Sequence, residues 1–258
     1  MKNLTILLII TSGLLLAACG DDESGADVEA TPETTEAPTA DTEPTLEPDD
    51  ETASASTGAA EDPSVSSVTV IAEVWADNWF SLTVNGDFIG EDSVPITTER
   101  SFNAETFTFE TTLPMTIAIE AKDFKETDSG IEYIGERNQQ MGDGGIIAQF
   151  TDAATGDVLA VTNSSWSILS VHQAPLDKSC EQAADPDTAC EWLIIDPPTG
   201  WETIDFDSSA WTSATEWSEA DVSPKDGYDE ISWTPSAALI WGTDLEIDNT
   251  VLLRTVVG

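Results

Sequence analysis

The stretch Val74-Trp75-Ala76-Asp77-Asn78-Trp79-Phe80-Ser81-Leu82-Thr83-Val84-Asn85-Gly86 decides the fold class. Apolar residues recur with period 2 and many are β-branched or aromatic, which is typical of a half-buried strand. Asp77-Asn78 can interrupt the strand, because short polar side chains bond their own backbone in turns. Asn85-Gly86 predicts a hairpin, since a type I′ turn needs positive φ at both central positions.

The two faces of this stretch differ in character. Trp75, Asp77 and Trp79 share one face, whereas the other is the predicted core face and carries the apolar residues Val74, Ala76, Phe80, Leu82 and Val84. Tryptophans beside a carboxylate suit a sugar, because a pyranose ring has one apolar face and a polar edge. They also suit packing, if a long loop covers them. Both interpretations are open at this point.

Short alternating segments continue to the end of the chain, separated by turn residues. The clearest are 107–109, 115–121, 144–150, 158–162 and 250–257, with a hairpin at Thr155-Gly156-Asp157. No stretch combines a 3.6-residue apolar period with helix caps. The sequence therefore predicts one all-β domain over residues 67–258, a single jelly-roll β-sandwich.

Several short motifs of this domain resemble those of a known module. They are Trp75-Ala76-Asp77-Asn78, Leu82-Thr83-Val84-Asn85-Gly86, Gly144-Gly145-Ile146, Ser165-Trp166, Gly200-Trp201, Phe206-Asp207-Ser208-Ser209-Ala210-Trp211, Leu239-Ile240-Trp241-Gly242 and Leu253-Arg254. Their order is similar to the galactose-binding-like jelly roll that accompanies β-galactosidase-type and α-rhamnosidase-type glycoside hydrolases. The resemblance implies carbohydrate binding, often with a structural calcium, and places Trp166, Trp211 and Trp241 in the core. The insert 178–198 and the lack of a catalytic barrel depart from it.

The first residues predict export and attachment to a membrane, and they are not part of the predicted fold. Lys2 precedes an apolar run, and Leu16-Ala17-Ala18-Cys19 resembles the lipobox of bacterial lipoproteins. This implies a signal peptide over 1–18 and lipidation of Cys19. The apolar run is shorter than the roughly 20 residues that span a bilayer. We therefore expect export and a lipid anchor in the membrane of the bacterial cell envelope, facing the periplasm or the cell surface.

Residues 19–66 predict a disordered acidic linker. From Gly20 to Ser66 the chain has no aromatic or basic residue and is rich in Thr, Pro, Glu, Asp, Ala and Ser. Such a segment cannot bury enough apolar surface to offset its conformational entropy. We expect an extended tether without a binding role.

The charge of the chain restricts its partners. It has 50 acidic and 8 basic residues, a formal net charge of −42. Fifteen of the acids lie in residues 20–66, so 35 acids and seven bases remain in 67–258. Nucleic acid is therefore not an expected partner. Divalent cations, or a saline medium that screens the repulsion, fit the charge better.

The remaining cysteines predict a disulfide. Cys180 and Cys190 belong to an exported chain, where pairing is the default. The loop between them has no apolar residue larger than alanine, so packing cannot hold it. Closing such a loop contributes about 2–3 kcal/mol.

No catalytic motif is distinguished by its sequence, and we expect a protein without enzyme activity. His172 is the one histidine, it lies in a strand pattern, and no Gly-x-Ser-x-Gly elbow presents a serine. Too few soft ligands are left for zinc. Calcium is the candidate cofactor, with Asp226, Asp229 and Glu230 as its candidate ligands, because oxygen-rich loops suit it.

The segment 122–143 is a long irregular connection, and such connections are often functional. Its Tyr133, Asn138 and Gln140 join Trp75, Asp77 and Trp79 as candidate ligand contacts. The leading hypothesis is a non-catalytic lipoprotein that binds glycan, with calcium as a candidate cofactor. The alternative is an adhesion or assembly module that docks a protein partner and has no sugar site.

Overall fold

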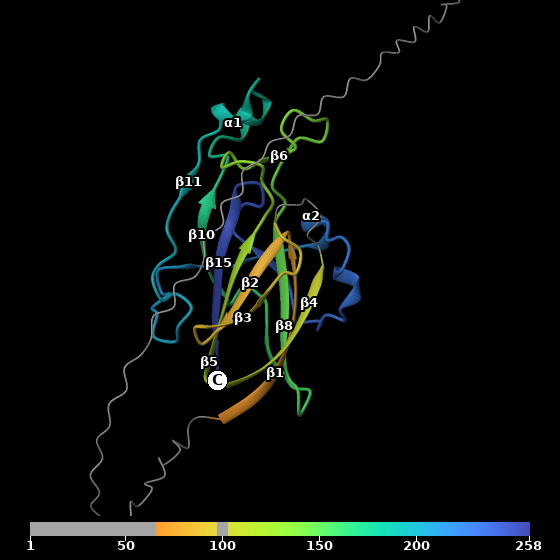
Figure 1. The fold of residues 1–258 in the computed structure, drawn as a ribbon, viewed down its shortest axis with the longest axis vertical. Coiled ribbons are helices and arrows are strands. Elements are labelled where there is room, and N and C mark those ends of the chain that lie inside the picture. Colours follow the sequence, from red (N-terminus) through yellow and green to blue (C-terminus); the bar gives the residue numbers. More distant parts are fainter. Residues whose placement is uncertain (1–65, 97–102) are drawn as a thin grey trace, which may run out of the picture. The chain divides into compact units, whose positions relative to one another are not determined.

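A computed structural model describes residues 66–96 and 103–258. The predictions of a signal peptide, a lipidated Cys19 and a linker lie outside these residues, except that Ser66 already belongs to the first strand. Two large antiparallel sheets pack face to face (Figure 1). This confirms the prediction of an all-β sandwich.

The first sheet contains six strands, and the second contains seven. The first has the order β13 (Thr215–Trp217), β14 (Leu239–Trp241), β8 (Gly145–Asp152), β1 (Ser66–Asp77) and β4 (Ala104–Leu113), with β9 (Val158–Val161) also paired to β8. The second has the order β11 (Leu193–Ile194), β10 (Ser167–Gln173), β15 (Asp248–Val257), β5 (Met115–Lys122), β2 (Trp79–Val84) and β3 (Asp87–Glu91), with β12 (Thr212–Ser213) also paired to β10. A separate small ladder joins β6 (Ile131–Glu132) and β7 (Gln140–Met141).

Helical structure is confined to single turns in the described chain. These are α1 (Pro186–Ala189), α2 (Glu219–Val222) and the 3₁₀ turns Lys178–Gln182 and Tyr228–Glu230. Within residues 66–96 and 103–258, no helix has the length and apolar character needed to cross a membrane.

The stretch that opens the domain supplies both sheets. β1 ends at Asp77 in the first sheet, and β2 begins at Trp79 in the second. Val74 and Phe80, on either side of this crossing, both enter the core between the sheets. The predicted interruption at Asp77-Asn78 is therefore the point where the chain passes from one layer to the other.

The predicted hairpin turns are confirmed. Asn85 has φ of 54° and Gly86 has φ of 87°, and Val84 pairs with Asp87 across the two-residue turn. Gly156, in the turn between β8 and β9, has φ of 78°. Both turns thus use the positive φ that glycine and asparagine tolerate.

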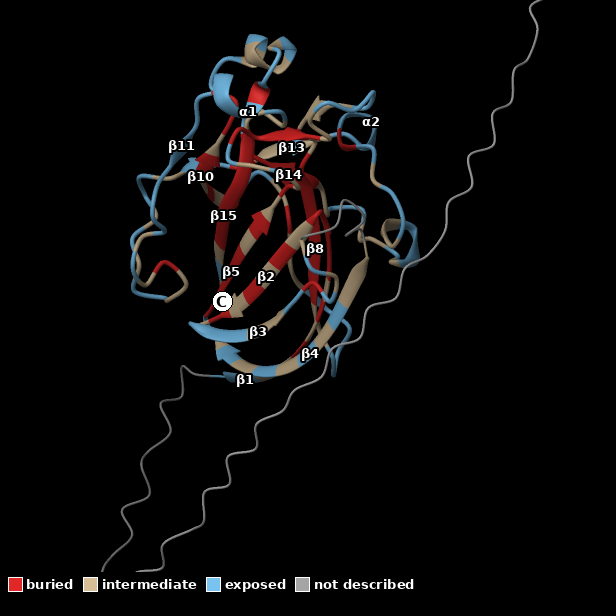
Figure 2. Cartoon of the chain, turned by 45° about the horizontal axis from the view of Figure 1, so that its top comes forward, coloured by how far each residue is buried: buried red, intermediate tan, exposed pale blue. Residues whose placement is uncertain are grey.

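The main core lies between the sheets, where Figure 2 shows the buried strand residues in red. Trp166 and Trp241 are buried in it, as predicted. Trp211 differs, because it is half-buried and packs against Trp201 and Phe206 on the outer face of the second sheet. Small clusters thus cover part of the outer faces as well.

The predicted disulfide between Cys180 and Cys190 is present. It closes the loop that contains α1 and ends just before β11. The bond therefore fixes the start of the segment that forms one edge of the second sheet.

Candidate cation site

Three carboxylates meet at one end of the sandwich because three strands end there. Asp77 is the last residue of β1, Asp123 follows β5, and Asp143 lies shortly before β8. β1 and β8 are antiparallel, with Asp77 opposite Gly145, so the end of one strand lies beside the start of the other. The amide of Asn78 donates to the carbonyl of Lys122 at 2.9 Å, which brings the end of β5 to the same place.

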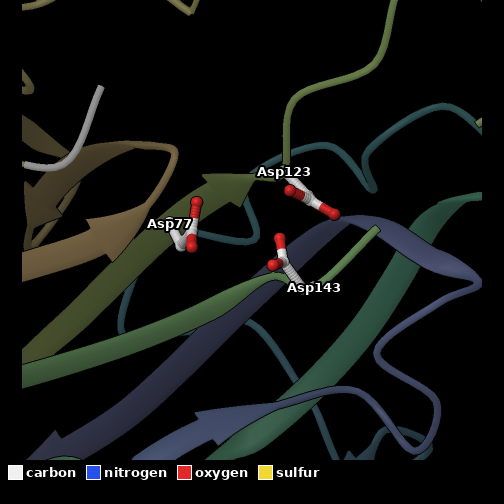
Figure 3. Close-up of side chains that lie close together, drawn as sticks. All are labelled: Asp77, Asp123 and Asp143. Atoms are coloured by element: carbon white, nitrogen blue, oxygen red, sulfur yellow. The ribbon is translucent and has the colours of Figure 1, made fainter. Parts of the chain in front are cut away.

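One carboxylate oxygen from each of Asp77, Asp123 and Asp143 lies within 4.8 Å of the other two (Figure 3). Asp77 is 1 % exposed, Asp123 is 2 % exposed, and Asp143 is half-buried. Gly142 lets the chain approach this closely, since a Cβ on it would lie 2.0 Å from Oδ2 of Asp123. The cluster is therefore a small buried space that is lined by acidic oxygens.

The buried oxygens lack hydrogen-bond donors. Among the described residues, neither oxygen of Asp77 and neither oxygen of Asp123 accepts a hydrogen bond. The nearby amide of Phe124 donates to Oδ1 of Asn78 at 2.6 Å, and its influence lowers the pKa of Asp123 less than burial raises it. Burying a charged carboxylate without partners is costly, and folded proteins normally pair such groups. Burial of these carboxyls is therefore favourable only when they are protonated or when a cation lies between them.

The pKa values of the cluster are raised for the same reasons. Burial, followed by the charge of Asp143, raises the pKa of Asp77 well above its ordinary value. Burial, followed by the charge of Glu132, does the same for the pKa of Asp123. The pKa of Glu132 itself rises to about 8, through burial and then Asp143. Four neighbouring carboxyls cannot all be ionised here without a counter-charge.

Lys225 and Gln140 lie at the rim of the cluster. Nζ of Lys225 is 4.0 Å from Oδ2 of Asp143, and its charge lowers the pKa values of Asp77, Glu132 and Asp143. Nε2 of Gln140 donates to Oε2 of Glu132 at 3.0 Å. One ammonium group at this distance compensates only part of the negative charge.

The donor set indicates which cation would fit. All the clustered ligand atoms are carboxylate oxygens, which suit calcium and magnesium better than zinc or copper. Calcium accepts six to eight oxygens in flexible geometry, and it binds carboxylates in one- or two-oxygen fashion. Magnesium demands strict octahedral geometry and keeps several waters, which a buried cluster accommodates poorly. Calcium is the better fit.

The predicted ligand contacts Asp77 and Gln140 lie in or beside this cluster, but Trp75 does not. Trp75 is fully buried, so of the two open interpretations packing applies to it, and its ring is not available as a ligand contact. Tyr228 and Trp233 cover it, and its Nε1 donates to the carbonyl of Asp226 at 3.2 Å. The cover therefore comes from the segment before β14 and not from the connection 122–143.

The other predicted contacts are spread over the surface. Trp79 is half-buried on the outer face of the second sheet, with Nζ of Lys122 4.7 Å from its ring centre. Tyr133 is half-buried, with its ring centre 6.2 Å from that of Phe124. Asn138 is exposed. Because Trp75 and Trp79 belong to different sheets, the six candidates do not converge on one site.

The predicted calcium ligands lie elsewhere as well. Asp226, Asp229 and Glu230 are exposed, and none belongs to the clustered carboxylates found among the described residues. Sequence reasoning did not single out Asp123 and Asp143 as ligands. The indication that the sequence held was their position, since Asp123 directly follows a strand, Asp143 comes just before one, and Asp77 ends one.

The fold and the cluster together define a β-sandwich with a candidate calcium site. Comparison with protein families, with curated proteins and with solved structures found no match to this chain. The resemblance to galactose-binding-like domains therefore stays a prediction.

Proposed function

We propose that the chain is a non-catalytic lipoprotein of the bacterial cell envelope whose β-sandwich binds calcium and presents a glycan-binding groove. One observation carries the calcium part. Asp77 and Asp123 are almost completely buried, their four carboxylate oxygens have no donor among the described residues, and they face Asp143. A divalent cation would turn this unfavourable burial into a coordination shell.

Charge balance supports one divalent ion. Asp77, Asp123, Asp143 and Glu132 bring up to four negative charges, and Lys225 brings one positive charge. A calcium ion would leave a single excess negative charge, which one shared proton can remove. Because Lys225 competes for the same oxygens, we expect weak binding with a Kd on the order of 0.1–1 mM, as in extracellular modules.

A polar groove of about 650 Å³ beside Asp143 supports the glycan part. Its lining includes Trp217, Gln140 and Thr243. An aromatic face with nearby amides and hydroxyls matches the mixed chemistry of a sugar ring. Asp221 and Asp244 also line it, so a neutral or amino sugar fits better than a uronate or a sulfated sugar.

The lipid anchor at Cys19 is proposed from the sequence pattern alone. Acylation would hold the protein on a membrane of the envelope, and the acidic segment 20–66 would act as its tether. In this arrangement the calcium content of the surrounding medium would determine the occupancy of the site.

Thermal melting of the full chain with calcium or with chelator tests the cation site. We expect calcium to raise the melting temperature, and Asp77→Asn and Asp123→Asn each to abolish the rise. Both variants should melt higher than the parent in chelator, because they remove a buried carboxyl that lacks a partner. Asp92→Asn is the matched control, since Asp92 is also buried and has a pKa raised to about 6 but lies outside the cluster.

Two outcomes would reject this assignment. An unchanged melt at millimolar calcium would rule out the site. Loss of the calcium response in Asp226→Asn with Asp229→Asn, but not in Asp77→Asn, would return the site to the loop that the sequence suggested. A glycan array probed with and without calcium tests the groove separately, and no signal in either condition would remove the glycan part alone.

A further inference from the structure

The segment that contains β11 exposes a run of large apolar side chains. Residues 191–197 are all exposed, and Figure 2 shows the segment in pale blue. Trp192, Leu193, Ile194 and Ile195 are 47 %, 47 %, 51 % and 39 % exposed. Single exposed apolar residues are ordinary, but four consecutive large ones on an acidic protein mark an interaction surface.

β11 is also an edge strand. It pairs with β10 through His172 opposite Ile194 and Gln173 opposite Leu193, and it has no partner strand on its other side among the described residues. Open edges expose unpaired backbone groups, so proteins usually protect them with charges, bulges or coverings. Here the four apolar side chains stand at the edge, and the charges lie only at its ends.

The edge is held in place before any partner arrives. The disulfide between Cys180 and Cys190 ends one residue before Glu191. The amide of Leu176 donates to the carbonyl of Glu191, and the amide of Ile195 donates to the carbonyl of Val171, both at 2.9 Å. A fixed backbone loses little conformational entropy on binding, which favours affinity.

A groove of about 810 Å³ lies beside the edge. Ile194, Ile195 and Pro197 line it together with Phe124 and Val171. Charged side chains line the rest of the groove, among them Glu120, Glu126, Asp196, the ion-paired Lys122 and Lys125, and Asp123 of the carboxylate cluster. The groove therefore suits an apolar peptide side chain with a basic neighbour better than a sugar ring.

The charges around the edge indicate the character of the partner. Glu191 and Asp196 flank the apolar run, and no Lys or Arg occurs between Lys178 and Lys225. Lysines near the groove are already paired, Lys122 with Glu120 at 3.2 Å and Lys125 with Asp128 at 2.8 Å. A partner with basic residues at its ends is therefore complementary. A second copy of this chain would bring the same acidic ends together, and the acidic segment 20–66 would be repelled.

We propose that the open edge of β11 binds an extended peptide segment of a partner protein, with alternating apolar side chains and basic residues at its ends. The peptide would add a strand to the second sheet. Its backbone would pair with β11, and an apolar side chain would enter the groove that Ile194 and Ile195 line. The groove shares Asp123 with the proposed calcium site, whereas the edge of β11 itself lies outside the calcium and glycan sites, and the proposal rests on neither of them.

Binding of a synthetic peptide to the full chain tests the proposal. The probe alternates valine with threonine between paired lysines and carries a fluorophore for anisotropy measurements. We expect saturable binding that Trp192→Ser with Ile194→Ser weakens at least about tenfold. Both positions are half exposed, so the fold should survive. Val158→Ser with Val256→Ser is the matched control, because these valines are 48 % and 52 % exposed elsewhere and should leave binding unchanged.

Further comparisons separate this edge from general attraction to an acidic protein. A peptide with serine in place of valine should bind at least about tenfold more weakly. Glu191→Gln with Asp196→Asn should weaken binding and reduce its salt dependence. Asp77→Asn should leave peptide binding unchanged, which keeps the result independent of the calcium site. The proposal would be overturned by no binding, by equal binding of the serine peptide, or by sedimentation showing that Trp192 and Ile194 instead hold two copies of this chain together.

Discussion

At the scale of single residues, the carboxylates at Asp77 and Asp123 set the chemistry of the domain. Each is buried without a donor among the described residues, so each is stable only as a neutral acid or as a cation ligand. Protons and calcium therefore compete for the same oxygens. Acid should empty the site of calcium, and calcium should release protons as it binds.

The pH dependence of stability follows from the raised pKa of Glu132. This pKa rises from an ordinary 4.5 to about 8 in the folded protein, so the folded state holds a proton that the unfolded state releases. Stability in chelator should fall as pH rises from about 4.5 to about 8, because folding then has to retain that proton. Melting temperatures across this range measure the effect. Calcium should flatten the profile, and Glu132→Gln should reduce its slope without calcium, because the raised pKa values of Asp77 and Asp123 still contribute. A profile that rises with pH in chelator would contradict the raised pKa values.

The surroundings of Arg254 predict that its substitution lowers the free energy of unfolding. It is 4 % exposed, and its guanidinium donates to the carbonyls of Phe206 and Thr203, both at 2.8 Å. Arg254→Met would leave the carbonyl of Phe206 without its donor and would leave that of Thr203 only the amide of Phe206, so we expect a loss of about 1–3 kcal/mol in the free energy of unfolding by urea. Arg137→Met, at an exposed position, should lower the free energy of unfolding by less than about 0.5 kcal/mol. Equal losses would show that the carbonyls find other donors.

At the scale of elements, strand ends rather than strand interiors build the candidate site. Asp77 closes β1, Asp123 follows β5, and Asp143 lies just before β8, so the site contains residues from both layers. A cation there would link the two sheets at one end. The ordinary core between the sheets does not need it, because β1, β2, β5 and β8 already bury their apolar faces there.

The hairpin turns offer a matched pair of glycines. Gly86 has φ of 87°, and a Cβ on it would lie 3.3 Å from Cγ2 of Thr203, whereas Gly156 has φ of 78° and open space around it. Ala at either position should cost about 1 kcal/mol, because a side chain disfavours positive φ. Urea unfolding should show a larger loss for Gly86→Ala than for Gly156→Ala. The reverse order would mean that the approach of Thr203 does not constrain this turn.

The alternation of apolar residues predicted the strands and turns near Asp77, but not what covers them. Parity separates the two sides of a strand, and it correctly placed Val74 and Phe80 in the core. It cannot tell which distant segment covers the other side. Trp75 is buried by Tyr228 and Trp233, about 150 residues later, and no local pattern contains that information. The carboxylate cluster was missed for the same reason, since it depends on how three strands are arranged.

At the scale of the whole molecule, the acidic charge is the dominant property. Residues 67–258 contain 35 acids and seven bases, so the folded domain repels itself. Such repulsion is screened within about 10 Å at moderate salt. It also favours any positively charged species at the surface, including the basic peptide ends proposed for the edge of β11.

Salt and calcium should stabilise the protein in distinguishable ways. We expect sodium chloride to raise the melting temperature gradually, because it screens charges that are spread over the surface. Calcium should act at lower concentration and saturate, because it occupies one site. In Asp77→Asn the response to sodium chloride should remain and the saturable response should disappear. A parent protein that responds identically to both salts at equal ionic strength would have no specific site.

β1 would be the first strand to carry a mechanical load under the proposed lipid anchor at Cys19. β1 begins at Ser66, and its opposite end is Asp77. β1 lies between β4 and β8, so a pull along its axis strains both ladders together instead of opening them one bond at a time. A cation bound by Asp77 would pin the far end of that strand to both layers. Under that proposal, the force that the domain withstands before β1 separates would rise with the calcium concentration of the medium.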